Sequence, residues 1–115
     1  MTAAEGGLGT AVSSDGGQVT VTISGEIDVS TGPCLKQALQ AALDRRPGRI
    51  VVDFTRVEFC DCCGLGVLLG GRRQARRAGI DFQVTGVAAP TVVKLIRLFG
   101  LAEVLGVQRP QGGPA

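Results

Sequence analysis

The chain of 115 residues contains no histidine, tryptophan or tyrosine, and only four phenylalanines. Without histidine, Ser-His-Asp and Cys-His arrangements and histidine-ligated metal sites are excluded. No side chain that ordinarily titrates near neutrality is present. A conventional hydrolase is therefore hard to build from this composition. Because aromatic residues are scarce, the core has to be built mainly from valine, leucine, isoleucine and alanine.

The chain also lacks a strong excess of one charge and any long apolar run. The net charge of +2 argues against nucleic acid as the main partner, because phosphate binding usually requires a clear basic excess. No stretch approaches the roughly 20 apolar residues that span a bilayer. Residues 1–7 lack the basic and apolar regions of a signal peptide. We therefore predict a cytoplasmic protein, with mostly reduced thiols, that binds neither nucleic acid nor membrane.

The hydrophobic content of 44% is sufficient for the core of one domain. Residues 1–17 are interpreted as an N-terminal segment with a candidate edge strand at 9–13. Turn residues at 15–17 then predict a hairpin with the following strand. Residues 18–107 are interpreted as the folded domain. Residues 108–115, rich in proline and glycine, are predicted to form a flexible tail.

Hydrophobic periodicity predicts alternating strands and helices along this domain. Polar and apolar residues alternate at 18–24 and 80–84, which indicates strands, and the apolar run within 49–54 indicates a central strand. Helical spacing predicts three helices. The first starts at Pro33 and ends before Pro47, and the second runs from Cys63 to Ala78. The third runs from Pro90 to Phe99, whose side chain is expected to face inward. The predicted fold class is an α/β domain, a mixed sheet of four or five strands with three or four helices packed on it.

The segment Asp61–Gly66 joins the predicted central strand to the second helix. Such a junction presents free backbone N–H groups and the positive end of the helix dipole to solvent. The side chains at this position are the thiols of Cys62 and Cys63. We expect Asp61 to cap this helix, and Asp28 to begin the turn into the first helix, where Ser30 or Thr31 is a further candidate cap.

Three segments resemble motifs of STAS domains. Residues 24–28, Ser-Gly-Glu-Ile-Asp, resemble the family's Gly-Glu-(Leu/Ile)-Asp element. Residues 57–69 resemble the phosphorylation-site segment, usually Phe-x-Asp-Ser-(Ser/Thr)-Gly-Leu, and residues 99–101 resemble a (Thr/Ser/Phe)-Gly-Leu motif. The resemblance covers about residues 18–105 in the family order. It implies a single STAS-like domain.

The resemblance also implies the function of an anti-sigma factor antagonist. Single-domain members bind an anti-sigma factor, often a serine kinase with a histidine-kinase-like ATPase fold, and so release a sigma factor. It therefore implies a transcription regulator that is not an enzyme, is a monomer or weak dimer, and has no catalytic residue, metal or cofactor. The residues expected to contact the partner are Glu26, Asp28, Ser30, Thr31, Asp61, Cys62, Cys63, Gly64 and Leu65.

In the family, the kinase phosphorylates the serine that follows the aspartate of the motif. Carried over by position, this serine corresponds to Cys62, and the next hydroxyl position to Cys63. A serine kinase aligns an alcohol, not a larger sulfur atom, and a phosphorylated thiol is far more labile. We therefore expect switching at Cys62 to be lost or much reduced. Ser30 and Thr31 on the neighbouring loop remain alternative phosphoacceptors.

The cysteines also allow other interpretations. Cys60 and Cys63 form a C-x-x-C pattern before a helix, whose N-terminus favours thiolates, although Asp61 and Glu58 oppose this. A thiol-based redox-sensing STAS module and a scaffold subunit of a larger STAS assembly are the alternative functions. A zinc site is disfavoured, because adjacent cysteines chelate one ion poorly and the chain has no second C-x-x-C. Cys60 is expected in the core, and Cys34 is expected to be inert.

Two further charged features are interpreted as structural. Arginines in the segment 72–77 complement the C-terminus of the second helix and keep its outer face solvated, and no aromatic residue is interleaved to stack on bases. Asp53, at a strand end, suggests a response-regulator phosphoacceptor. That chemistry needs a lysine on a later strand, whereas Lys36 and Lys94 both fall on predicted helices. The interpretation of Asp53 as a phosphoacceptor is therefore rejected.

Overall fold

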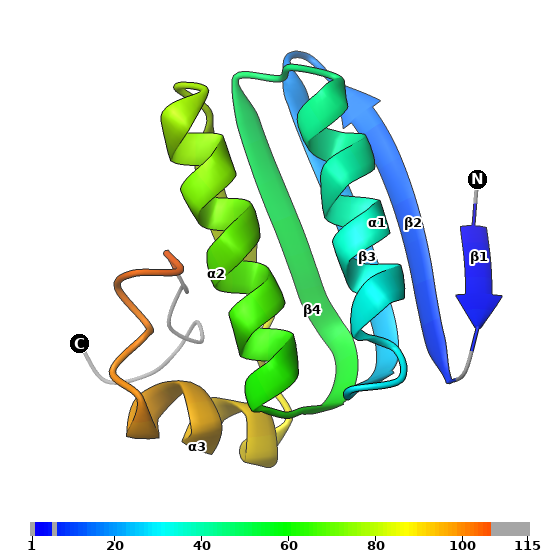
Figure 1. The fold of residues 1–115 in the computed structure, drawn as a ribbon, viewed down its shortest axis with the longest axis vertical. Helices are drawn as coiled ribbons and strands as arrows, with labels where there is room; N and C mark the ends of the chain where they lie inside the picture. The colour runs from blue at the N-terminus through cyan, green and yellow to red at the C-terminus, as the bar shows by residue number, and fades with distance from the viewer. Residues whose placement is uncertain (1, 6, 107–115) are drawn as a thin grey trace.

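A computed structural model describes residues 2–5 and 7–106, which form a five-stranded sheet with three helices (Figure 1). The elements in chain order are β1 (Thr2–Glu5), β2 (Leu8–Asp15), β3 (Gln18–Ile27), α1 (Gly32–Asp44), β4 (Arg49–Cys60), α2 (Cys62–Arg77), β5 (Asp81–Thr85) and α3 (Pro90–Leu98). The strand order is β1-β2-β3-β4-β5, with antiparallel pairs up to β3 and parallel pairs from β3 to β5. The predicted α/β class, with its mixed sheet, is confirmed.

Helices α1 and α2 are the crossover connections between the parallel strands β3, β4 and β5. Both lie on the same face of the sheet, side by side, as parallel crossovers of one hand require (Figure 1). Each helix runs back along the sheet, so it begins near the carboxyl end of the strand before it. The loop after β3 and the junction after β4 are therefore at the same end of the molecule, where α3 also lies (Figure 1).

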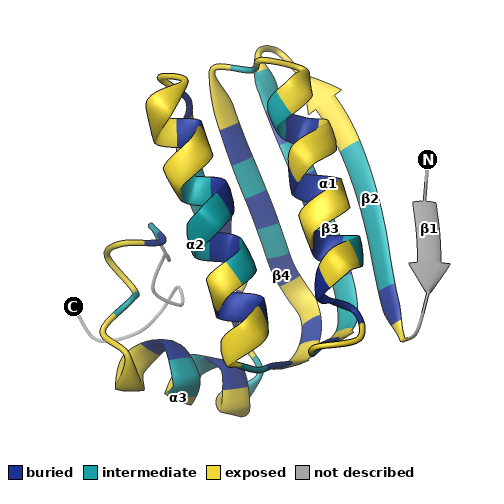
Figure 2. Cartoon of the chain, viewed as in Figure 1, coloured by how far each residue is buried: buried dark blue, intermediate teal, exposed yellow. Residues whose placement is uncertain are grey.

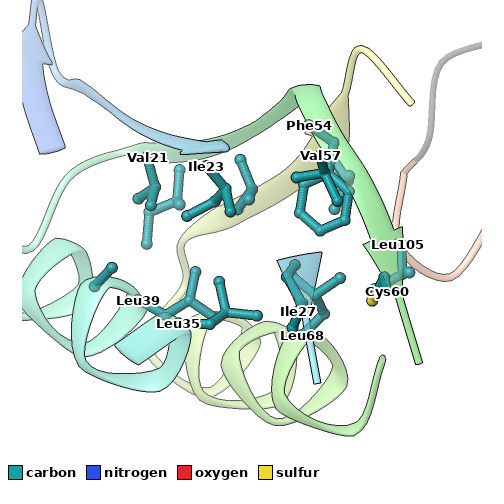
Figure 3. Packing of buried hydrophobic residues seen from close by; sticks show 14 of the residues in the cluster. Val21, Ile23, Ile27, Leu35, Leu39, Phe54, Val57, Cys60, Leu68 and Leu105 are labelled. Carbon is teal, nitrogen blue, oxygen red and sulfur yellow. The ribbon is translucent and has the colours of Figure 1, made fainter. Parts of the chain in front are cut away.

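The core lies between these helices and one face of the sheet. The strand register aligns Val21 of β3 with Val52 of β4, and Val52 with Val84 of β5, and all three are fully buried. Buried leucines of α1 and α2, including Leu35 and Leu68, face the strand side chains (Figure 3). The outer surfaces of both helices are exposed (Figure 2). Aliphatic side chains dominate this core, as the composition predicts.

The sheet extends beyond the strands predicted from the sequence. Strand β2 pairs along its whole length with β3, and β1 pairs with residues 8–11 on its other side, so the predicted edge strand at 9–13 is covered by a further strand as far as Ala11. The predicted boundary at residue 18 therefore falls inside the sheet. Strands β3 and β4 stay paired as far as Ile27 and Cys60, because two register shifts accommodate the irregular segment after Phe54.

The C-terminal part differs from the prediction at Phe99, whose side chain is 55% exposed instead of inward-facing. The buried face of α3 is formed by Val92 and Ile96. Turns at 101–106 return to the sheet, where the N–H of Val84 donates to the carbonyl of the buried Leu105 at 3.1 Å. The predicted tail at 108–115 lies outside the described residues. Among the described helices, none is long and apolar enough to cross a bilayer.

The first turn of α2 packs closely against the ends of β3 and β4 at Gly64. A Cβ atom on Gly64 would lie 2.6 Å from Sγ of Cys60 and 2.6 Å from Cγ2 of Ile27. Both distances are shorter than van der Waals contact, so glycine is required here to let the helix approach the strands. Gly66, half a turn further along the helix, has no other atom within 4 Å of such a Cβ.

This difference predicts opposite effects of two alanine substitutions in the same helix. We expect Gly64→Ala to lower the free energy of unfolding by about 1 to 3 kcal/mol, because Cys60 and Ile27 would have to move. We expect Gly66→Ala to raise it by up to about 1 kcal/mol, because alanine favours helix and meets no obstruction. Urea unfolding of the two variants measures both effects. Equal effects would contradict the packing account.

Candidate functional site

The loop at residues 28–31 and the junction at 61–63 are held together by the parallel pairing of β3 and β4. Ile27, the last residue of β3, pairs with Cys60, the last residue of β4. The pairing continues into the loops, because the N–H of Asp61 donates to the carbonyl of Ile27 at 3.1 Å. The two segments that the sequence singled out are therefore adjacent.

Asp28 organises the turn that leads into α1, as predicted. Its Oδ1 accepts hydrogen bonds from the N–H and the hydroxyl of Ser30, at 2.9 and 2.7 Å, and from the N–H of Thr31 at 3.1 Å. These bonds lower the pKa of Asp28 below its ordinary value of 3.8, the hydroxyl of Ser30 having the largest effect and the N–H of Thr31 the next. Asp28 is therefore a fixed negative charge on this loop.

Thr31 stands at the cap position of α1, but its side chain does not cap the helix. The hydroxyl instead donates to the carbonyl of Glu26 at 2.9 Å and accepts from the N–H of Asp28 at 2.9 Å. Thr31 is only 1% exposed, so these two hydrogen bonds lie in the protein interior and hold the loop against the end of β3. Because Thr31 is buried, the predictions that it contacts a partner and that it is an alternative phosphoacceptor are corrected. Ser30 is exposed.

Asp61 caps α2, as predicted. Its backbone is extended, and its Oδ1 accepts from the N–H of Gly64 at 3.1 Å. Gly64 and Leu65 were also expected to contact a partner, but both are buried. Their role is to pack the first turn of α2 against the strands, which removes them from the contact surface. Asp61 itself is partly exposed beside Cys62.

The structure separates the four cysteines by environment. Cys62 and Cys63 are exposed on the first turn of α2, and Cys34 is partly buried on α1. Cys60 is in the core, as predicted, and burial, reinforced by the charge of Asp61, raises the pKa of its thiol to about 12. Cys60 therefore remains protonated, which removes one member of the C-x-x-C pattern from thiolate chemistry. Among the described residues, no group of three or more cysteine, aspartate or glutamate side chains could hold a metal ion.

Cys62 and Cys63 are adjacent in the chain but face different surroundings. Cys63 lines a groove between α1 and α2, together with Val67 and Gly70 of α2 and Lys36 of α1. Cys62 lies outside that groove lining, at the first position of α2, directly after Asp61, whose N–H donates to the carbonyl of Ile27 beside loop 28–31. The expected contact surface therefore includes Cys62, and Cys63 belongs to the neighbouring groove.

The sequence prediction missed Val29, whose side chain is 76% exposed at the tip of the loop. An apolar residue between the polar Asp28 and Ser30 was the available signal. We define the junction surface as the exposed or partly exposed residues of loop 28–31, of the end of β3 and of the junction up to Cys62, namely Glu26, Asp28, Val29, Ser30, Asp61 and Cys62. The exposed Cys63 is assigned to the groove that it lines. It presents an apolar side chain and a thiol among three carboxylates, which suits it to contact with a protein that offers apolar and basic groups.

The hydrogen bonds of Asp28 predict a pH dependence. Because its pKa is lower in the folded than in the unfolded protein, ionised Asp28 stabilises the fold above pH 3.8, and this contribution is lost as the pH falls through the lower folded-state pKa. We expect Ser30→Ala to raise this pKa towards 3.8, measured by NMR titration of the Asp28 carboxyl carbon. Ser14→Ala, in β2, is the control. An unchanged pKa in Ser30→Ala would contradict the assignment.

Comparison with known proteins identifies the family. A family model described as "Mlab, STAS domain" matches residues 10–107. The anti-sigma-B factor antagonist of Listeria monocytogenes is 26% identical over 98 residues, 85% of each chain. The anti-sigma F factor antagonist of Paenibacillus polymyxa is 30% identical over 92 residues, 79% of this chain and 78% of the relative. The crystal structure of an anti-sigma factor antagonist from Mycobacterium paratuberculosis superposes with a TM-score of 0.81 at 30% identity, covering 90% of this chain and 87% of that one. The chain therefore belongs to the STAS domain family.

Proposed function

We propose that this protein is an anti-sigma factor antagonist that binds an anti-sigma factor through the junction surface and so releases a sigma factor. The observation that carries the proposal is the exposed Cys62 at the first position of α2, directly after the capping Asp61 and beside loop 28–31. The relatives described as anti-sigma factor antagonists support this function. The protein then acts in the bacterial cytoplasm by partner switching, as a binding protein and not an enzyme.

The junction surface has features of a protein contact. Val29 supplies an exposed apolar side chain. Hydrogen bonds of Asp28 and Thr31 hold the loop that carries it in one conformation. A contact that is already ordered costs little conformational entropy on binding. The carboxylates of Glu26 and Asp28 precede Val29 in the sequence and complement a partner with basic side chains. We propose a serine kinase of the histidine-kinase-like ATPase fold as that partner, bound by a monomer or weak dimer of this chain.

The thiol of Cys62 changes how such a complex is regulated. A phosphoserine at this position would add about −1.5 to −2 charges, which a closely fitted partner surface would not accommodate. Cys62 offers a kinase no alcohol, and Thr31 is buried, so two candidate phosphoacceptors are removed. Ser30 is exposed, but its hydroxyl donates to Asp28. We therefore propose that this chain binds its partner constitutively.

Substitution of Val29 tests the proposed surface. We expect Val29→Asp to weaken binding to the anti-sigma factor about tenfold or more, because the apolar contact is lost and a charge is buried. Val104→Asp is the matched control, since Val104 is 38% exposed in the turns after α3 and outside the junction surface. Isothermal titration calorimetry with each anti-sigma factor of the source bacterium measures the dissociation constants. Binding to none of them by the folded protein would exclude the function, and equal binding by both variants would exclude the surface.

Incubation with the partner kinase and ATP tests the role of Cys62. We expect no stable phosphorylation of the wild-type chain and phosphorylation of Cys62→Ser at residue 62, because only the variant presents an alcohol after Asp61. Cys63→Ser, which places the alcohol one residue later, should stay unmodified. Intact-mass spectrometry detects the added phosphate. Equal phosphorylation of the wild type, for instance at Ser30, would contradict the loss of switching.

A further inference from the structure

We propose that Cys63 is a site of reversible thiol modification, at which a low-molecular-mass thiol that carries a carboxylate forms a mixed disulfide and occupies the groove between α1 and α2. The proposal concerns a surface beside the junction surface and does not depend on the anti-sigma factor. It assigns different roles to two adjacent thiols, one for protein contact and one for small-molecule attachment.

The groove has room for such a group. It has a volume of about 460 Å³, and its walls include the apolar side chains of Leu39, Leu43 and Val67. Glycines leave it open on the side of α2, where a Cβ on Gly66 or Gly70 would meet no other atom within 4 Å. Apolar walls of this kind favour the aliphatic part of a bound molecule.

Cys63 lies on the face of α2 that lines this groove. Cys63, Val67 and Gly70 follow each other at intervals of four and three residues, so they lie on one face of the helix, and all three line the groove. Cys62 is displaced by one residue, about 100° around the helix axis. A group attached to Cys63 can therefore lie along the groove, whereas one attached to Cys62 would extend from the junction surface.

The polar residues of the groove determine which group is favoured. Lys36 of α1 lines it and supplies a cation, and Gln40 and Gln74 supply amide groups from the two helices. A carboxylate is the complementary group for the ammonium of Lys36, and amides can donate to it as well. The combination of a thiol, a cation and apolar walls fits a small thiol with an aliphatic part and a terminal carboxylate.

The reaction is a thiol–disulfide exchange with the symmetric disulfide of the small thiol. The thiolate of Cys63 attacks one sulfur of that disulfide, and the new S–S bond forms as the original S–S bond breaks. The other half leaves as a thiolate and takes up the proton that Cys63 released. The small disulfide is the oxidant, so no other co-reactant is needed. Excess reduced thiol reverses the exchange.

Glutathione redox buffers provide the test with the full chain. The equilibrium constant for the mixed disulfide is measured by peptide mass spectrometry in Cys62→Ser, which retains Cys63, and in Cys63→Ser, which retains Cys62. We expect the constant at Cys63 to exceed that at Cys62 by about fivefold or more, because only the Cys63 adduct can bury its aliphatic part in the groove. Fragmentation of the peptide separates these adducts from any on Cys60.

Two further substitutions, made in Cys62→Ser, examine the groove itself. Gly70→Leu places an apolar side chain at the groove, from a position where a Cβ would meet no other atom within 4 Å, and should lower the constant at Cys63 to that at Cys62. Lys36→Gln should lower it by about two- to fivefold, as expected for an exposed ion pair, whereas Lys94→Gln on α3 should leave it unchanged. Equal constants at the two thiols, or a constant at Cys63 unchanged by either groove substitution, would overturn the proposal. Thermal unfolding verifies that each variant is folded.

Discussion

The parallel pairing of β3 with β4 is the constraint on which the junction surface depends. Pairing continues to Ile27 and Cys60 and then passes into the loops through the hydrogen bond from the N–H of Asp61 to Ile27. Without it, loop 28–31 and the first turn of α2 would be independent segments. Gly64 completes the arrangement, because only a residue without Cβ lets α2 approach the ends of both strands.

The residues of this end of the molecule divide into those that position it and those that are exposed for contact. Thr31, Gly64 and Leu65 are buried and position the two segments. Val29 and Cys62 are exposed and available to a partner. The motifs that identify the family therefore consist partly of packing residues, and the proposed regulatory position, Cys62, can differ while the arrangement around it is kept.

Much of the fold could be predicted from the sequence, because periodicity, proline and glycine mark most of its elements. The extension of β4 to Cys60 could not, since Thr55 and Arg56 interrupt the alternation and the register shifts that accommodate them depend on β3. Within the site, the capping by Asp61 follows from local sequence. The burial of Thr31 does not, because its hydroxyl is satisfied by a carbonyl of β3, and the separation of the two exposed thiols depends on how α1 packs beside α2.

In the proposed function, this chain displaces a sigma factor from its anti-sigma factor and is not switched off by phosphorylation. The most direct measurement follows the release of the sigma factor from its complex with the anti-sigma kinase, in the presence of ATP, after the chain is added. We expect release that persists while the kinase consumes ATP. An intact complex, or release that reverses with time as the chain becomes phosphorylated, would contradict it.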